Sequence, residues 1–145
     1  MLNQVETMFE NMLDMMKKLK KATYEKHMKD FLDKNGHFFT EMAQHVEAAE
    51  DKDAAAKEVA VVFTEAVNKK FSVKGKIRPR TQADLNFFMI YYVFPAVLLA
   101  ESEDKDLIAK NIRDEWAAKF KDSNIAYADY DKIYGGFRQK IFGIF

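Results

Sequence analysis

The strongest chemical signal in this sequence is a run of positive charge between residues 69 and 80. Six cations and no acid occur in these twelve residues. Lysine and arginine side chains bind phosphate and carboxylate groups, and exposed backbone amides at a helix start can add to such a site. The competing interpretation is a solvated loop that pairs with acids of this chain or of a neighbour. The candidate residues for anion or partner binding are Lys69, Lys70, Lys74, Lys76, Arg78 and Arg80.

A second signal is a possible metal-binding face. His37, Glu41 and His45 are spaced by four residues, so one helix would present all three on the same side. Imidazole and carboxylate ligands suit zinc or iron. Helical bundles that bind metals usually draw Glu-x-x-His motifs from two helices, and this sequence has none. A solvated helix face is therefore the preferred interpretation, and a metal site is the alternative.

A third signal lies in an apolar stretch that contains Tyr91, Tyr92 and Pro95. Proline removes one amide donor from a helix, and a kink lined by tyrosines could frame a small pocket. The same residues, together with Asn86, are also explained as core polar groups with internal hydrogen-bond partners. We prefer the second explanation.

The elements that must position these residues are helical. Apolar residues recur at steps of three and four through most of the chain, as on one face of a helix. Residues 72–80 are the one clear connection, for which a loop is preferred over a short hairpin. Thr81 to Asp84 resembles a capping box that opens the next helix. The expected helices cover residues 2–19, 24–35, 37–49, 53–71, 81–100, 105–121 and 127–139.

The fold class follows from the run Phe87 to Ala100, which contains no charged residue. Such a run leaves no polar face for water, and we expect it to be buried. It is shorter than the roughly 20 residues of a membrane-spanning helix, and acids flank it. The sequence predicts one all-α domain over residues 1–145, with six or seven helices around a buried central helix at about 81–100.

Composition narrows the classes of function. Lys plus Arg and Asp plus Glu both total 23, so the whole molecule has no strong field for nucleic acid or anionic lipid. The absence of cysteine excludes disulfides, thiolate zinc sites and thiol nucleophiles. The start of the sequence carries Glu6 and Glu10 and lacks the pattern of a signal peptide. We therefore expect a cytoplasmic protein.

Motifs of catalysis are absent: the sequence has no Gly-rich phosphate loop, nucleophile elbow or His-Glu-x-x-His motif. The sequence favours a small intracellular binding or protein-interaction domain without catalytic activity or cofactor. Its expected partner is a protein or a second copy of the chain, and an acidic or phosphate-bearing partner is possible through the basic segment. The alternatives are a metal-dependent enzyme or carrier that uses His37, Glu41 and His45, and a nucleic-acid or phosphate-ligand binder that uses residues 69–80.

Overall fold

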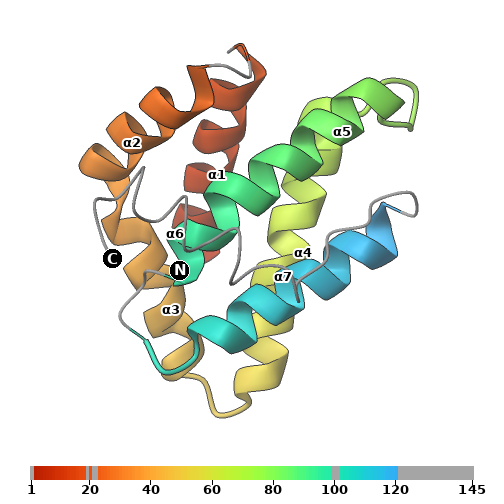
Figure 1. Ribbon diagram of the computed structural model, residues 1–145. Helices are drawn as coiled ribbons and strands as arrows, with labels where there is room; N and C mark the ends of the chain where they lie inside the picture. The colour runs from red at the N-terminus through yellow and green to blue at the C-terminus, as the bar shows by residue number, and fades with distance from the viewer. Residues whose placement is uncertain (1, 19, 21–22, 99–101, 121–145) are drawn as a thin grey trace.

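The computed structural model describes residues 2–18, 20, 23–98 and 102–120, and every structural statement below concerns these residues. They form an all-α bundle, as predicted (Figure 1). The predicted helix at 127–139 lies outside the described residues. The elements are α1 Leu2–Lys17, α2 Tyr24–Asn35, α3 His37–Glu47, α4 Lys52–Phe71, α5 Pro79–Phe88, a π-helical turn Met89–Val93, α6 Phe94–Leu98 and α7 Lys105–Lys119.

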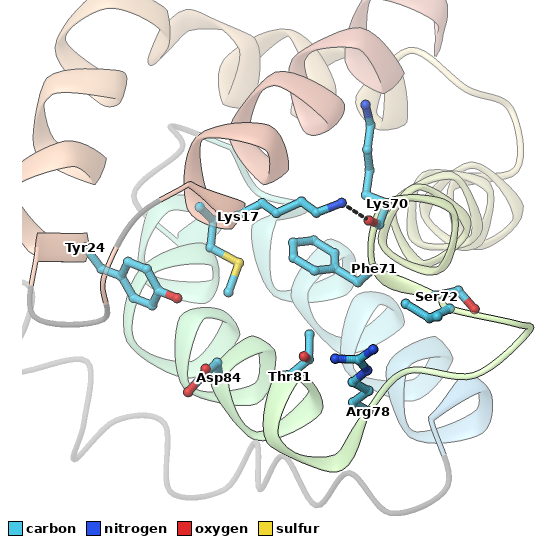
Figure 2. Close-up of a pocket in the computed structure, with 10 residues that line it drawn as sticks. Lys17, Tyr24, Lys70, Phe71, Ser72, Arg78, Thr81 and Asp84 are labelled. Atoms are coloured by element: carbon cyan, nitrogen blue, oxygen red, sulfur yellow. Dashed lines mark hydrogen bonds between the residues drawn. The ribbon is translucent and has the colours of Figure 1, made fainter.

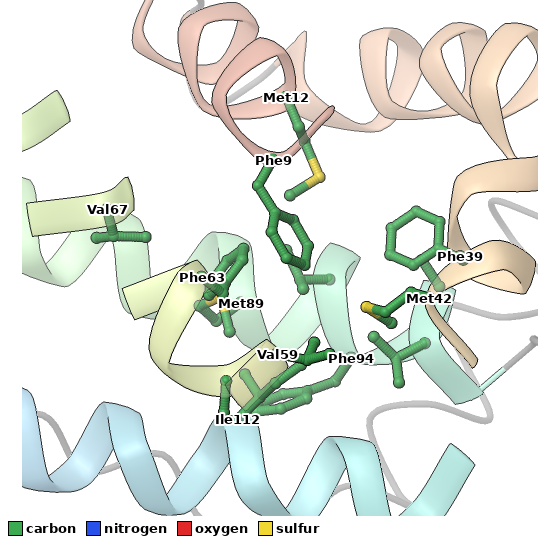
Figure 3. Close-up of a cluster of buried hydrophobic side chains, with 14 of the residues drawn as sticks. Phe9, Met12, Phe39, Met42, Val59, Phe63, Val67, Met89, Phe94 and Ile112 are labelled. Atoms are coloured by element: carbon green, nitrogen blue, oxygen red, sulfur yellow. The ribbon is translucent and has the colours of Figure 1, made fainter. Parts of the chain in front are cut away.

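The core lies where α4 packs against α1, α3 and α7. Phe9 of α1 contacts Phe63 of α4 edge to face, with ring centroids 4.6 Å apart. Phe63 also lies 6.2 Å from the ring of Trp116 on α7. Figure 3 shows the surrounding apolar side chains, among them Met42 of α3. Because α1 and α7 both bury a face against α4, this helix links the two sides of the bundle.

The segment predicted as one buried helix is divided into α5, the π-helical turn and α6. Within the predicted range 81–100, Ala83 is exposed, and Phe87 and Tyr91 are half-buried. The buried members are Leu85, Phe88, Met89, Tyr92, Val93, Phe94, Ala96 and Val97. In the π-helical turn, the amide of Phe94 donates to the carbonyl of Met89, five residues earlier. Pro95 follows two residues after the end of the turn and has no amide hydrogen to continue an α-helical pattern.

The start of α5 corrects the predicted capping box. The helix begins at Pro79, with Arg78 as its N-cap and no side-chain cap, so Thr81 lies inside the first turn. Proline is favoured at the first helical position because its fixed φ suits a helix and its missing N–H would be unpaired there anyway. By contrast, α4 has a side-chain cap: the Asp51 carboxylate accepts a hydrogen bond of 3.0 Å from the Ala54 amide.

The connection between α4 and α5 contains a tight two-residue turn, which the sequence analysis placed second to a loop. Lys74 and Gly75 both have positive φ, of 54° and 80°, as a type I′ turn requires. Val73 and Lys76 exchange both backbone hydrogen bonds across it, at 2.7 and 3.2 Å. This turn projects the middle of the basic segment into solvent.

Within the described residues, no helix combines the length and apolarity that a transmembrane span requires.

Candidate functional site

The structure divides the basic segment into two parts. Lys69 and Lys70, at the end of α4, form ion pairs with α1. The Lys69 Nζ lies 3.2 Å from Glu10 Oε1, and the Lys70 Nζ lies 3.1 Å from Asp14 Oδ1. These two lysines therefore link the end of α4 to α1. Exposed ion pairs of this kind contribute at most about 1 kcal/mol each to the free energy of unfolding.

The other four cations of the basic segment form no ion pairs of this kind with described residues. All are exposed, and none forms an ion pair with another residue in the described part of the chain. They come from the tight turn and from the start of α5. We call them the four unpaired cations: Lys74, Lys76, Arg78 and Arg80.

A pocket of about 340 Å³ opens beside the basic segment, between the end of α1, the start of α2, the end of α4 and the first turns of α5 (Figure 2). We call it the α5 pocket. Ligand sites commonly range from about 300 to 1,000 Å³, so its size suits a small molecule. The residues that line it are Met16, Lys17, Tyr24, Lys70, Phe71, Ser72, Val73, Arg78, Thr81 and Asp84.

One wall of the α5 pocket combines positive charge with apolar surface. The Lys17 ammonium donates a hydrogen bond of 2.9 Å to the backbone carbonyl of Lys70. It also lies 5.8 Å from the centroid of the Phe71 ring, within the range of a cation–π contact. Figure 2 shows the Arg78 side chain reaching toward the same ring from the α5 side. An anion at this wall would meet two cationic side chains.

Tyr24 provides an unused polar group at the opposite wall. The residue is only 4% exposed, and its ring packs on Phe88 and Tyr92 at 5.6 and 6.1 Å. Its hydroxyl points into the α5 pocket and forms no hydrogen bond with another described residue (Figure 2). Burial, and secondarily the Asp84 carboxylate, raise the pKa of Tyr24. At neutral pH the hydroxyl is therefore protonated and available as a donor.

The first turn of α5 adds further donors. The side chains of Arg78 and Thr81 have no hydrogen-bond partner among the described residues. Because the first amides of a helix lack intrahelical acceptors, those of Arg80 and Thr81 are also unpaired within α5. The arrangement offers hydrogen-bond donors and positive charge to an oxygen-rich anion.

The predicted metal ligands lie on α3, away from this pocket. His37 and Glu41 are exposed, and His45 is half-buried with an Nε2 that has no partner among the described residues. Within the described part of the chain, no three His, Cys, Asp or Glu side chains are grouped so that they could hold a metal ion.

The tyrosines of the apolar stretch take part in an aromatic cluster. Tyr91 packs on Phe87 at 4.5 Å, and Tyr92 stacks on Phe88 at 5.7 Å. Neither tyrosine lines the α5 pocket. The cluster does support that pocket, because Tyr24 packs on two of its rings.

Asn86 has hydrogen-bond partners within the protein, as predicted from the sequence. Its Oδ1 accepts hydrogen bonds from the Trp116 Nε1, at 2.9 Å, and from the Gln82 Nε2, at 3.0 Å. The acceptor thus joins α5 to α7.

Two contributors to the α5 pocket were not predicted from the sequence. Lys17 belongs to a weaker basic cluster at residues 17–21, and Tyr24 reads as an ordinary member of an apolar helix face. The break between α1 and α2, which brings both to the pocket, has no proline or glycine to mark it. No family model matches this chain, and neither the curated proteins nor the solved structures contain a significant match.

Proposed function

We propose that this protein is a binding domain for an anionic partner, which it engages at the face formed by the tight turn, the start of α5 and the α5 pocket. The observation that carries the proposal is the division of the basic segment. Two of its cations are neutralised by α1, whereas the four unpaired cations remain exposed on the tight turn and at the start of α5. Mutual repulsion among unpaired cations costs free energy that an anionic partner would relieve.

A nucleic-acid partner is less favoured than a carboxylate or phosphate ligand. Proteins that bind single strands place exposed aromatic rings between cations so that bases can stack on them. The one aromatic residue of the basic segment, Phe71, is 8% exposed. The exposed apolar residue of the turn is Val73, which offers no stacking surface. The segment therefore provides charge and hydrogen-bond donors without a platform for bases.

The proposal is tested by charge removal with a matched control. One variant replaces the four unpaired cations by Gln. The other removes the same charge from exposed lysines on α2 and α4, through Lys26→Gln, Lys29→Gln, Lys34→Gln and Lys57→Gln. A fluorescently labelled polyaspartate peptide serves as the anionic probe, and binding is measured by polarisation at low and moderate salt.

We expect the parent and the control variant to bind the peptide, and added salt to weaken both because it screens exposed charge. The variant without the four unpaired cations should bind at least tenfold more weakly and keep the helical circular dichroism of the parent. Equal binding by the two variants would show that the basic segment is a solvated connection.

A further inference from the structure

We infer that the α5 pocket is a binding site for a small amphipathic anion that carries one phosphate or carboxylate group. The anionic group binds at Arg78, the apolar body packs on Phe71, and a ligand oxygen accepts a hydrogen bond from the Tyr24 hydroxyl. This inference rests on the proposed function and specifies the chemistry of its ligand.

The anionic group is assigned to the Arg78 end because of the charges there. The guanidinium is a planar fork of donors that matches two oxygens of a carboxylate or phosphate. Lys17 adds a second cation, which is held in place by its hydrogen bond to the Lys70 carbonyl. The Asp84 carboxylate lines the other side of the pocket and would repel a second anionic group. The ligand therefore carries a single anionic group.

The apolar body is assigned from the wall between the two polar ends. Phe71 is only 8% exposed, yet it lines the pocket together with Met16. An aromatic ring and a flexible thioether side chain make a surface on which apolar groups of varied shape can pack. Inorganic phosphate would leave this wall unused.

The Tyr24 hydroxyl is the feature that distinguishes a built site from a basic surface. It is the polar end of an almost fully buried side chain, and its direction is set by ring packing on Phe88 and Tyr92. The hydroxyl oxygen itself is open to the pocket, and no described residue forms a hydrogen bond with it. A ligand oxygen in the pocket can therefore accept a hydrogen bond from it.

Four small molecules separate these contributions. The full probe is 4-hydroxyphenyl phosphate, which has an anionic group, a ring and a distal oxygen. Phenyl phosphate lacks the distal oxygen, inorganic phosphate lacks the ring, and 4-hydroxyphenylacetate replaces phosphate by carboxylate. Affinities are measured by isothermal titration calorimetry for the parent and for Arg78→Gln, Tyr24→Phe and the control Lys57→Gln, which removes an exposed cation of α4 that does not line the pocket.

We expect the full probe, or its carboxylate counterpart, to bind at least tenfold more tightly than inorganic phosphate. The more tightly bound of the two identifies the natural anionic group. Arg78→Gln should weaken binding about tenfold or more, whereas Lys57→Gln should change it less than twofold. Tyr24→Phe should reduce the affinity for the full probe to that for phenyl phosphate and leave phenyl phosphate unaffected.

Three results would overturn the inference: equal affinity for inorganic phosphate and the full probe, equal loss in the Arg78 and Lys57 variants, or no effect of Tyr24→Phe on the full probe. If none of the small anions binds while the polyaspartate peptide still does, the pocket is rejected and the proposed function stands. If neither kind of probe binds, both are rejected.

Discussion

The hydrogen bond between Asn86 and Trp116 gives a sharp test of how α5 is held against α7. Trp116 is 0% exposed, and its indole N–H donates to Asn86 Oδ1 at 2.9 Å. Asn86→Leu keeps a side chain of similar size but removes the acceptor. The indole N–H is then buried without a partner, which costs about 1 to 3 kcal/mol. The hydrogen bond from Gln82 is lost as well, so we expect the free energy of unfolding to fall by about 2 kcal/mol.

Urea unfolding measures this loss directly, because Trp116 is the only tryptophan and its fluorescence reports on the same site. Circular dichroism should give a coincident transition if unfolding is two-state. Asn86→Asp, which keeps an oxygen acceptor, is the control and should cost less. In a Trp116→Phe background, Asn86→Leu should lower the free energy of unfolding by less, because no indole N–H remains to lose its hydrogen-bond acceptor. A loss below about 0.5 kcal/mol for Asn86→Leu in the parent would refute the reasoning.

Three further predictions concern burial, capping and pH. Phe88→Asp places a charge at a site that is 1% exposed and should abolish cooperative thermal unfolding; a melting curve like that of the parent would contradict this. Asp51→Ala removes the cap of α4 and should cost about 0.5 to 2 kcal/mol in urea unfolding, whereas Asp53→Ala, which removes no cap, should cost less. Burial, Glu25 and Tyr24 raise the pKa of Tyr92 from 10.0 to about 12. Because the folded state holds this proton more tightly, the stability that Tyr92 contributes is present below pH 10.0 and is lost as pH rises toward about 12. Tyr92→Phe should reduce that loss, which is measured by urea unfolding at successive pH values.

The helices were predictable because each buries one face, and that periodicity is written locally in the sequence. The structure places α3 at His37–Glu47, α4 at Lys52–Phe71 and α7 at Lys105–Lys119, within a few residues of the predicted bounds. The start of α5 was misplaced by two residues because the prediction rested on the capping-box pattern at Thr81 and did not consider Pro79 as a helix start. Both are helix-start signals, and the proline prevailed because its φ is already set for the first turn.

The candidate site was predictable only in part, because its geometry depends on contacts between distant segments. The sequence shows six cations within twelve residues, but Glu10 and Asp14, which neutralise two of them, lie 59 and 56 residues away. Tyr24 has an apolar pattern typical of a core residue, and only the packing of α2 against the π-helical turn shows that its hydroxyl opens into a pocket.

A crystal structure of the protein with 4-hydroxyphenyl phosphate tests the central claim most directly. Our account predicts that the phosphate binds beside the Arg78 guanidinium, that the ring lies against Phe71 and that the distal oxygen accepts a hydrogen bond from Tyr24. A ligand that binds outside the α5 pocket, with its phosphate held only by Lys74 and Lys76 at the tight turn, would contradict it.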